Sequence, residues 1–220
     1  MVRARCAAPS PERLTWADLG LAFWNPVSLA KKLRHHWSWL PAYGTAVLAL
    51  AANSWLIGRL APNNAQLTGG PLVWLRTILV VSLVVSPLLT PILQAFFLAL
   101  GLTFVSYFNG VRTRFSKLFS IAMWALLPAY GLGVILNSIV LPMVPPESWG
   151  RIALGPAVFF EIGTWAHRVL RFFDISNIIA LGLLWVFLGY AHNLESKRAR
   201  GWMLGVGALW MTLAVSFAYS

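Results

Sequence analysis

Few side chains in this sequence are of the types that do acid, base or metal chemistry, and their positions argue against an enzyme site. All six acidic residues fall in predicted tails, loops or segment edges. The single cysteine, Cys6, excludes an internal disulfide and any multi-cysteine metal site. No HExxH motif, glycine-rich phosphate loop or nucleophile elbow occurs. We therefore expect a protein that is not an enzyme and has no catalytic residue, metal or cofactor.

Polar side chains do occur inside the uncharged stretches, around a pair of prolines. Pro87 and Pro91 lie in the uncharged run 77–111, which is too long for one simple membrane crossing. Each proline lacks an amide donor and clashes with the preceding helical turn, so a kink is expected there. The residues predicted to form the kink or a cavity wall are Asn53, Ser86, Pro87, Pro91, Gln94 and Asn137. The same residue types form ordinary hydrogen bonds between membrane helices, so a polar path and simple packing are both open.

The elements that hold these residues are predicted to be membrane helices. Hydrophobic residues make up 59% of the chain and charged residues 10%, which is far too apolar for a dissolved globular domain. Several uncharged runs reach or approach the roughly 20 residues that cross about 30 Å of hydrocarbon. We predict an all-α polytopic bundle within residues 41–220, with five transmembrane helices at about 41–60, 74–108, 117–141, 175–194 and 201–219.

The positions of the basic residues favour one crossing, not two, for the run that contains the prolines. One crossing places 12 basic residues on the side of the N-terminal tail and 5 on the other, whereas two crossings give 9 and 8. Basic loops are cytoplasmic by the positive-inside rule. A turn between two crossings would also leave unpaired amides in hydrocarbon, at several kcal/mol each. We expect one kinked helix, a cytoplasmic N-terminus and an external C-terminus, in a bacterial cytoplasmic (inner) membrane.

Residues 1–40 are predicted to form a basic cytoplasmic tail with an amphipathic helix on the membrane surface. The helix is expected over 16–36, broken near Pro26, with Trp16, Phe23 and Ala30 on its apolar face. Anionic lipid headgroups, and not nucleic acid, are the expected counter-charge for the net charge of +11. The residues predicted to bind the membrane surface or a partner are Lys31, Lys32, Arg34, Trp37 and Trp39.

A second amphipathic helix is expected on the external side, over 155–173, with Phe159 and Phe173 on its apolar face. It either lies at the interface or docks onto the bundle. Asp174 follows it and is placed to cap the fourth crossing. In the last crossing, Gly201 and Gly205 form a small-residue face for close helix packing, either within the chain or between two copies.

Three stretches together resemble the Yip family, the Ypt-interacting polytopic membrane proteins, in its prokaryotic branch. They are "WNPVSLAKKLRHHWSWLPAYG", "FSKLFSIAMWALLPAYGLGVIL" and "FFDISNIIALGLLWVFLGYAHNLESKRARGWMLG". The resemblance implies a five-crossing fold and a non-enzymatic role with a membrane partner. Eukaryotic members bind prenylated small GTPases, but the short tail here offers little surface for one, so GTPase binding is not expected.

Two functions follow as hypotheses. The first is an accessory subunit or membrane-organising protein, with an integral membrane partner or a second copy as its partner. The alternative is a permease-like or lipid-moving transport protein that uses the kinked second helix.

Overall fold

Helices account for every regular element that the computed structural model describes, and no strand occurs in this part of the chain. The fold class is therefore all-α, as predicted. The structure describes residues 14–35, 38–60, 71–143, 155–161, 164–170, 173–190 and 197–218.

Three described helical stretches are long and apolar enough to cross a membrane. They are Leu40–Ile57 within α3 (Leu40–Leu60), Val85–Phe108 within α4 (Pro71–Phe108), and Phe115–Met143, which joins α5 (Phe115–Val140) to a short 3-10 turn. The remaining two predicted segments are helical as well: α7 (Ile175–Tyr190) is a shorter apolar helix, and α8 is Lys197–Ala218. Three spans are thus supported, and the crossing of the membrane by α7 and α8 stays a prediction.

The run with the two prolines forms a single helix. Pro87 and Pro91 both lie inside α4, so the chain does not turn back between two crossings there. The hydroxyl groups of Ser86 and Thr90 are 3.2 Å apart and share a hydrogen bond beside the prolines. From α3, the hydroxyl of Tyr43 donates to the carbonyl of Leu88, also at 3.2 Å. Neighbouring hydroxyl groups thus bond to each other and to the backbone where the prolines interrupt the hydrogen-bond ladder.

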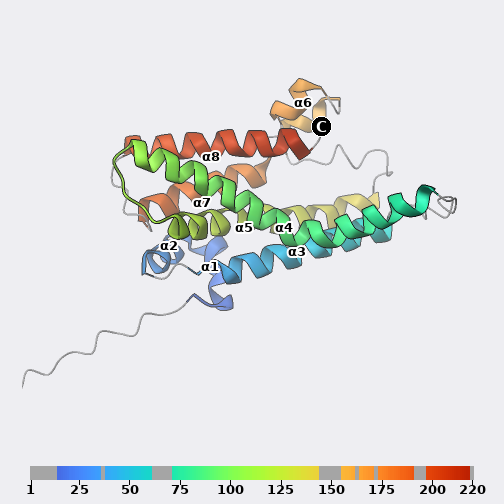
Figure 1. Ribbon diagram of the computed structural model, residues 1–220, viewed down its shortest axis with the longest axis horizontal. Helices are drawn as coiled ribbons and strands as arrows, with labels where there is room; N and C mark the ends of the chain where they lie inside the picture. Colours follow the sequence, from blue (N-terminus) through green and yellow to red (C-terminus); the bar gives the residue numbers. More distant parts are fainter. Residues whose placement is uncertain are drawn as a thin grey trace, which may run out of the picture.

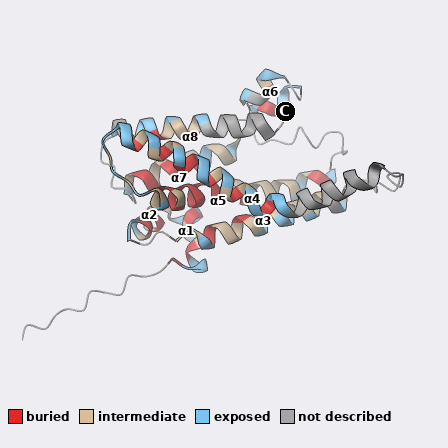
Figure 2. Ribbon diagram, viewed as in Figure 1, coloured by how far each residue is buried: buried red, intermediate tan, exposed pale blue. Residues whose placement is uncertain are grey.

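α5 lies at the centre of the bundle. It packs against α3, α4 and α7, while α8 packs against α4 and α7 (Figure 1). Residues 120–128 are buried without interruption, and Figure 2 shows buried residues gathered along this helix. A helix that is apolar on every side loses contact with water or lipid only when other helices surround it, which is the position that α5 occupies.

One end of the bundle gathers three segments far apart in sequence. The N-terminal helices, the turn between α4 and α5, the end of α7 and the start of α8 all lie at the left in Figure 1. These are the same three segments that the basic-residue count assigned to one side of the membrane. We refer to this as the basic end.

The N-terminal segment forms a hairpin of short helices. A 3-10 turn (Trp16–Asp18) leads into α1 (Leu19–Trp24), and α2 (Pro26–His35) follows after a break at Asn25. Trp16 and Phe23 are 57% and 51% exposed, while Leu29 and Leu33 are buried, and the contact of the exposed face with the membrane stays a prediction. The break resets the helical phase, so α1 turns one face to α5 and α2 another to α7.

The segment 155–173 forms two short helical pieces instead of one helix. A 3-10 turn (Pro156–Phe159) ends at Phe160, whose backbone is extended, and α6 (Trp165–Leu170) begins after it. The hydroxyl of Thr164 accepts a hydrogen bond from the amide of His167 at 3.2 Å, which is the geometry of a helix N-cap. Phe159 is 85% exposed. The segment is therefore not the single continuous helix that was predicted, because the extended residue separates its two halves.

Candidate functional site

The N-terminal hairpin is held by a carboxylate that is almost fully buried. Asp18 is 4% exposed, and its Oδ1 accepts a hydrogen bond from Lys32 Nζ at 2.8 Å. Its Oδ2 accepts from the amide and the hydroxyl of Thr15, at 2.8 and 3.2 Å. The ion pair joins the start of α1 to the last turns of α2, so it closes the open end of the hairpin.

The protonation of Asp18 reflects these contacts. Burial raises the pKa of this carboxyl, but the hydrogen bonds from Lys32 and Thr15 and the charge of Lys32 outweigh burial, so the pKa lies below its usual value of 3.8. The carboxylate is therefore charged at neutral pH. Sequence reasoning placed Asp18 only in the tail, although Thr15 and Asp18 have the three-residue spacing of a helix capping box.

The predicted basic cluster divides into two kinds of residue. Lys32 is half-buried and paired with Asp18, so it stabilises the hairpin. Lys31 and Arg34 are exposed. Arg34 lies close enough to Lys117, in the first turn of α5, for the two positive charges to repel each other. The structure thus leaves Lys31 and Arg34, and not Lys32, as the cations that α2 presents outward.

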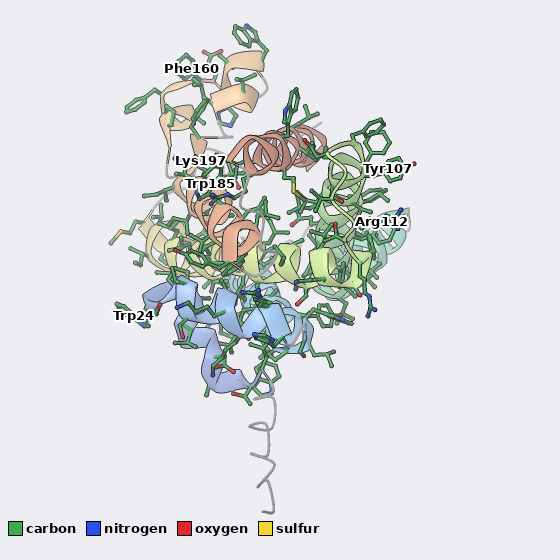
Figure 3. The ribbon with its side chains drawn as sticks, turned by 90° about the vertical axis from the view of Figure 1, so that its left-hand side faces the viewer. Trp24, Tyr107, Arg112, Phe160, Trp185 and Lys197 are labelled. Carbon is green, nitrogen blue, oxygen red and sulfur yellow. The ribbon has the colours of Figure 1, made fainter. Side chains whose placement is uncertain are left out.

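Further exposed cations lie on the neighbouring segments of the basic end. Arg112 and Arg114 belong to the turn between α4 and α5, and Lys197 begins α8. Figure 3 views this end and shows Arg112 and Lys197 on opposite sides of it. The sequence has no Asp or Glu between Asp18 and Glu147, so α2, α4 and α5 contribute no carboxylate to this end, while Glu195 precedes Lys197 at the start of α8. The basic end therefore attracts anionic groups.

The predicted aromatic anchors are placed differently from the expectation. Trp39 packs edge-to-face against Tyr43 and Phe119, with ring centroids 5.6 and 5.4 Å apart, so it fixes the start of α3 to α5. Trp37 lies outside the described residues. The outward-facing aromatic residues of the hairpin are Phe23 and Trp24, and Trp24 is 89% exposed (Figure 3). Sequence reasoning missed Trp24, because the face assumed across Asn25 excluded it.

The amide side chains near the proline pair bond across helices. Tyr130 of α5 donates from its hydroxyl to Gln94 Oε1 of α4 at 2.5 Å. Asn137 of α5 donates from Nδ2 to Asn53 Oδ1 of α3 at 2.6 Å. Pro87 and Pro91 are buried, whereas Ser86 is exposed. Each of the three amides thus has a partner on a neighbouring helix, as the packing interpretation expects.

The carboxylate of Asp174 sits at the first turn of α7. Its Oδ1 accepts hydrogen bonds from the amide of Ser176 at 3.0 Å and from the Ser176 hydroxyl at 2.5 Å. This is the geometry of an N-cap, in which Asp174 is the capping residue and the Ser176 hydroxyl donates to its carboxylate. The arrangement orders the start of α7 and leaves no reason to assign Asp174 to a ligand.

Close packing of α8 does not use the two glycines that the sequence suggested. A Cβ built on Gly201 or Gly205 has no described atom within 4 Å, and both residues are exposed. A Cβ on Gly207 would lie 2.8 Å from Leu184, and one on Gly101 of α4 would lie 2.7 Å from Val206. Packing within the chain therefore depends on Gly207 and Gly101, because α8 is rotated to turn the Gly201 face outward.

Chemistry-bearing residues do not converge elsewhere in the ranges that the structure describes. No group of three or more His, Cys, Asp or Glu side chains that suits a metal ion occurs there. The functional interpretation thus rests on the basic end and on the helix faces.

Comparison with protein families decides how this arrangement is classified. A family model described as the Yip1 domain matches residues 21–218. The chain belongs to this family. The Yip1 match starts inside α1 and ends with the last residue of α8, so it includes α2 and the end of α1, while Asp18 precedes it. The apolar helices and the Yip1 match together make the chain an integral membrane protein of the Yip type. Comparisons with curated proteins and with solved structures give no match.

Proposed function

We propose that this Yip1-domain protein is a non-enzymatic accessory subunit or membrane organiser that binds an integral membrane partner through its basic end. The observation that supports this most directly is the hairpin. A buried ion pair fixes its two helices, and Lys31 and Arg34 are exposed cations on α2, in a sequence that has no Asp or Glu between Asp18 and Glu147. A surface that is ordered before binding pays less entropy when a partner docks.

The basic end faces the cytoplasm in this proposal, and the membrane is a prokaryotic inner membrane. The excess of Lys and Arg at this end supports that orientation. Labelling of single cysteines tests it: Arg112→Cys and Lys197→Cys, each combined with Cys6→Ser, are expected to react only with a reagent that reaches the cytoplasm. Reaction of either one from outside would reverse the orientation.

Co-purification tests the docking surface. Lys31→Glu combined with Arg34→Glu is expected to lower recovery of the partner after gentle solubilisation at least tenfold, since two attractive charges become repulsive. Arg59→Glu is the matched control, because Arg59 is an exposed cation in the last turn of α3, away from the hairpin. Unchanged recovery with the double variant, in protein that melts at the wild-type temperature, would refute the proposal.

A permease-like or lipid-moving protein is the second candidate. The observation that favours it is the helix α4 itself, where two buried prolines interrupt the backbone hydrogen-bond ladder midway along the helix, beside the hydroxyl pair of Ser86 and Thr90. Such a site is a natural hinge. Lipid or solute flux in liposomes that depends on Pro87 and Pro91, without any partner present, would favour this candidate over the first.

A further inference from the structure

The outer face of α4 has an apolar groove in the half nearest the basic end. The groove has a volume of about 660 Å³, and its lining residues all belong to α4: Phe97, Leu100, Gly101, Thr103, Phe104 and Tyr107. Phe104 and Tyr107 are 65% and 80% exposed. Gly101 has no side chain, and Val206 of α8 fills the space beside it, so α8 borders the groove there. The groove therefore runs along α4 beside α8.

An exposed cation, Arg112, follows the end of α4, five residues after Tyr107, the last residue that lines the groove. The amide of Val111 donates to the carbonyl of Ser106 at 2.9 Å, and the hydroxyl of Thr113 bonds to the hydroxyl of Ser106, also at 2.9 Å. Arg112 lies between these two residues, so the turn holds its backbone against the last turn of α4. Figure 3 shows Arg112 and Tyr107 close together along the same edge of the molecule. The side chain of Arg112 is exposed.

The length of the groove matches one leaflet of a bilayer. Phe97 and Tyr107 are ten residues apart, which corresponds to roughly 15 Å along a helix. This is half of the roughly 30 Å of hydrocarbon in a membrane. A groove that starts beside an arginine and extends one leaflet deep has the dimensions of a phospholipid, with its phosphate at the arginine and an acyl chain along the aromatic residues.

We propose that this groove binds one anionic phospholipid, with the phosphate at Arg112 and an acyl chain against Phe104 and Phe97. The charge selects an anionic headgroup over a zwitterionic one, because the sequence holds no acidic residue from 19 to 146 that would repel it. The exposed aromatic side chains give the acyl chain apolar contact on one wall. This site lies on a different helix from the docking surface of Lys31 and Arg34, so either proposal can fail while the other stands.

Native mass spectrometry of the purified full-length protein tests the lipid site, with phosphatidylglycerol and phosphatidylcholine of identical acyl chains as probes. The wild-type protein is expected to retain one phosphatidylglycerol in preference to phosphatidylcholine. Arg112→Gln is expected to lower this preference about fivefold, the effect of one cation close to an anionic surface. Phe104→Ala is expected to lower retention of both lipids, since it removes acyl contact and leaves the charge.

Two control variants make comparable changes on α3, away from the groove. Arg59→Gln removes an exposed cation from α3, and Leu48→Ala truncates a side chain of α3 that is 67% exposed. Both are expected to leave retention at the wild-type level. Equal retention of the two lipids by the wild type, an unaltered preference in Arg112→Gln, or an equal loss in Arg59→Gln would overturn the proposal.

A second copy of the chain is the competing occupant of the groove. Phe104→Cys combined with Cys6→Ser distinguishes them, because Cys6 is the only native cysteine. The lipid site predicts that this variant stays monomeric under mild oxidation in native membranes. Efficient disulfide-linked dimers would show that a second copy covers the groove and would overturn the lipid assignment.

Discussion

The two amphipathic segments of this chain have similar sequence patterns but are fixed in different ways. The N-terminal hairpin is closed by a buried ion pair between Asp18 and Lys32 and packs against α5 and α7. The segment around α6 is closed by His167, whose Nδ1 lies 3.0 Å from the carbonyl of Ala157, and contacts the bundle through α8. In each segment a buried polar side chain links the two helical pieces across a break that apolar periodicity does not reveal.

The strength of the two contacts also differs. The carboxylate of Asp18 receives three hydrogen bonds, one of them from a charged donor. His167 is 2% exposed and makes one side-chain bond, while its Nε2 has no partner among the described residues. Hydrogen bonds to charged groups are worth roughly 1.5–3 kcal/mol and neutral ones roughly 1 kcal/mol. We therefore expect the hairpin to be the more stable of the two segments.

The largest effect is expected from Asp18→Ala. The change leaves the Lys32 ammonium half-buried without its carboxylate and is expected to destabilise the hairpin by about 2–3 kcal/mol. Hydrogen exchange of the α1 and α2 amides measures the loss, which should not spread to α6. Adding Lys32→Ala should restore part of the stability, because the unpaired charge is then gone. Equal exchange in Asp18→Ala and the wild type would show that the pair does not fix the hairpin.

Acidification is expected to destabilise the N-terminal hairpin, because protonation of Asp18 removes the charge that pairs with Lys32. Because the pKa of Asp18 is lowered in the folded chain, its contribution to stability is complete above the ordinary value of 3.8 and is lost as pH falls below it. Tryptophan fluorescence measures the unfolding of the hairpin. The variant for this measurement keeps Trp16 and Trp24 and has phenylalanine in place of the other tryptophans. Asp18→Asn serves as control and should remove the transition below this pH. A transition that persists in Asp18→Asn would assign it to another group.

A smaller effect is expected from His167→Leu. The variant loses the hydrogen bond to Ala157 but also removes the buried Nε2 that lacks a partner, so the net cost is expected to be about 1 kcal/mol. Protease sensitivity within 155–170 measures it. A loss as large as that of Asp18→Ala would contradict the ranking of the two segments.

The smallest effect is expected from removing a helix cap. Thr164→Ala deletes the hydroxyl that accepts from the amide of His167 and is expected to destabilise α6 by about 0.5–1 kcal/mol. Thr164→Ser keeps the hydroxyl and is the matched control. Exchange of the first amides of α6 should rise in the alanine variant alone, and equal exchange in both variants would exclude the cap.

The position of the helices could be predicted from the sequence because it depends on local properties. Uncharged runs are the signal for α3, α4 and α5, and the basic-residue count correctly favoured one helix through Pro87 and Pro91. That count worked because the charges of the loops add up independently, so the count does not depend on how the helices pack. The resemblance to the Yip family was also correct, because the Yip1 match over residues 21–218 contains all three stretches that carried it, while the prokaryotic branch stays a prediction.

The orientation of the helix faces could not be predicted, because it depends on contacts between distant residues. Asp18 and Lys32 are fourteen residues apart, a spacing that has no meaning until the chain turns at Asn25. Gly207, rather than Gly201, packs inward because the side chain of Leu184 from α7 fills the space beside it. In both cases a neighbouring element sets the rotation of a helix about its own axis, and sequence periodicity alone does not supply that neighbour.

The most direct test of the account places a photo-crosslinking amino acid at position 34 of the full chain in intact membranes, with position 59 as control. The account predicts that a crosslink to another membrane protein forms from position 34 and not from position 59, and that Asp18→Ala, which loosens the hairpin, weakens it. The absence of a protein crosslink at position 34, or a stronger one at position 59, would contradict the assignment of the basic end as the docking surface.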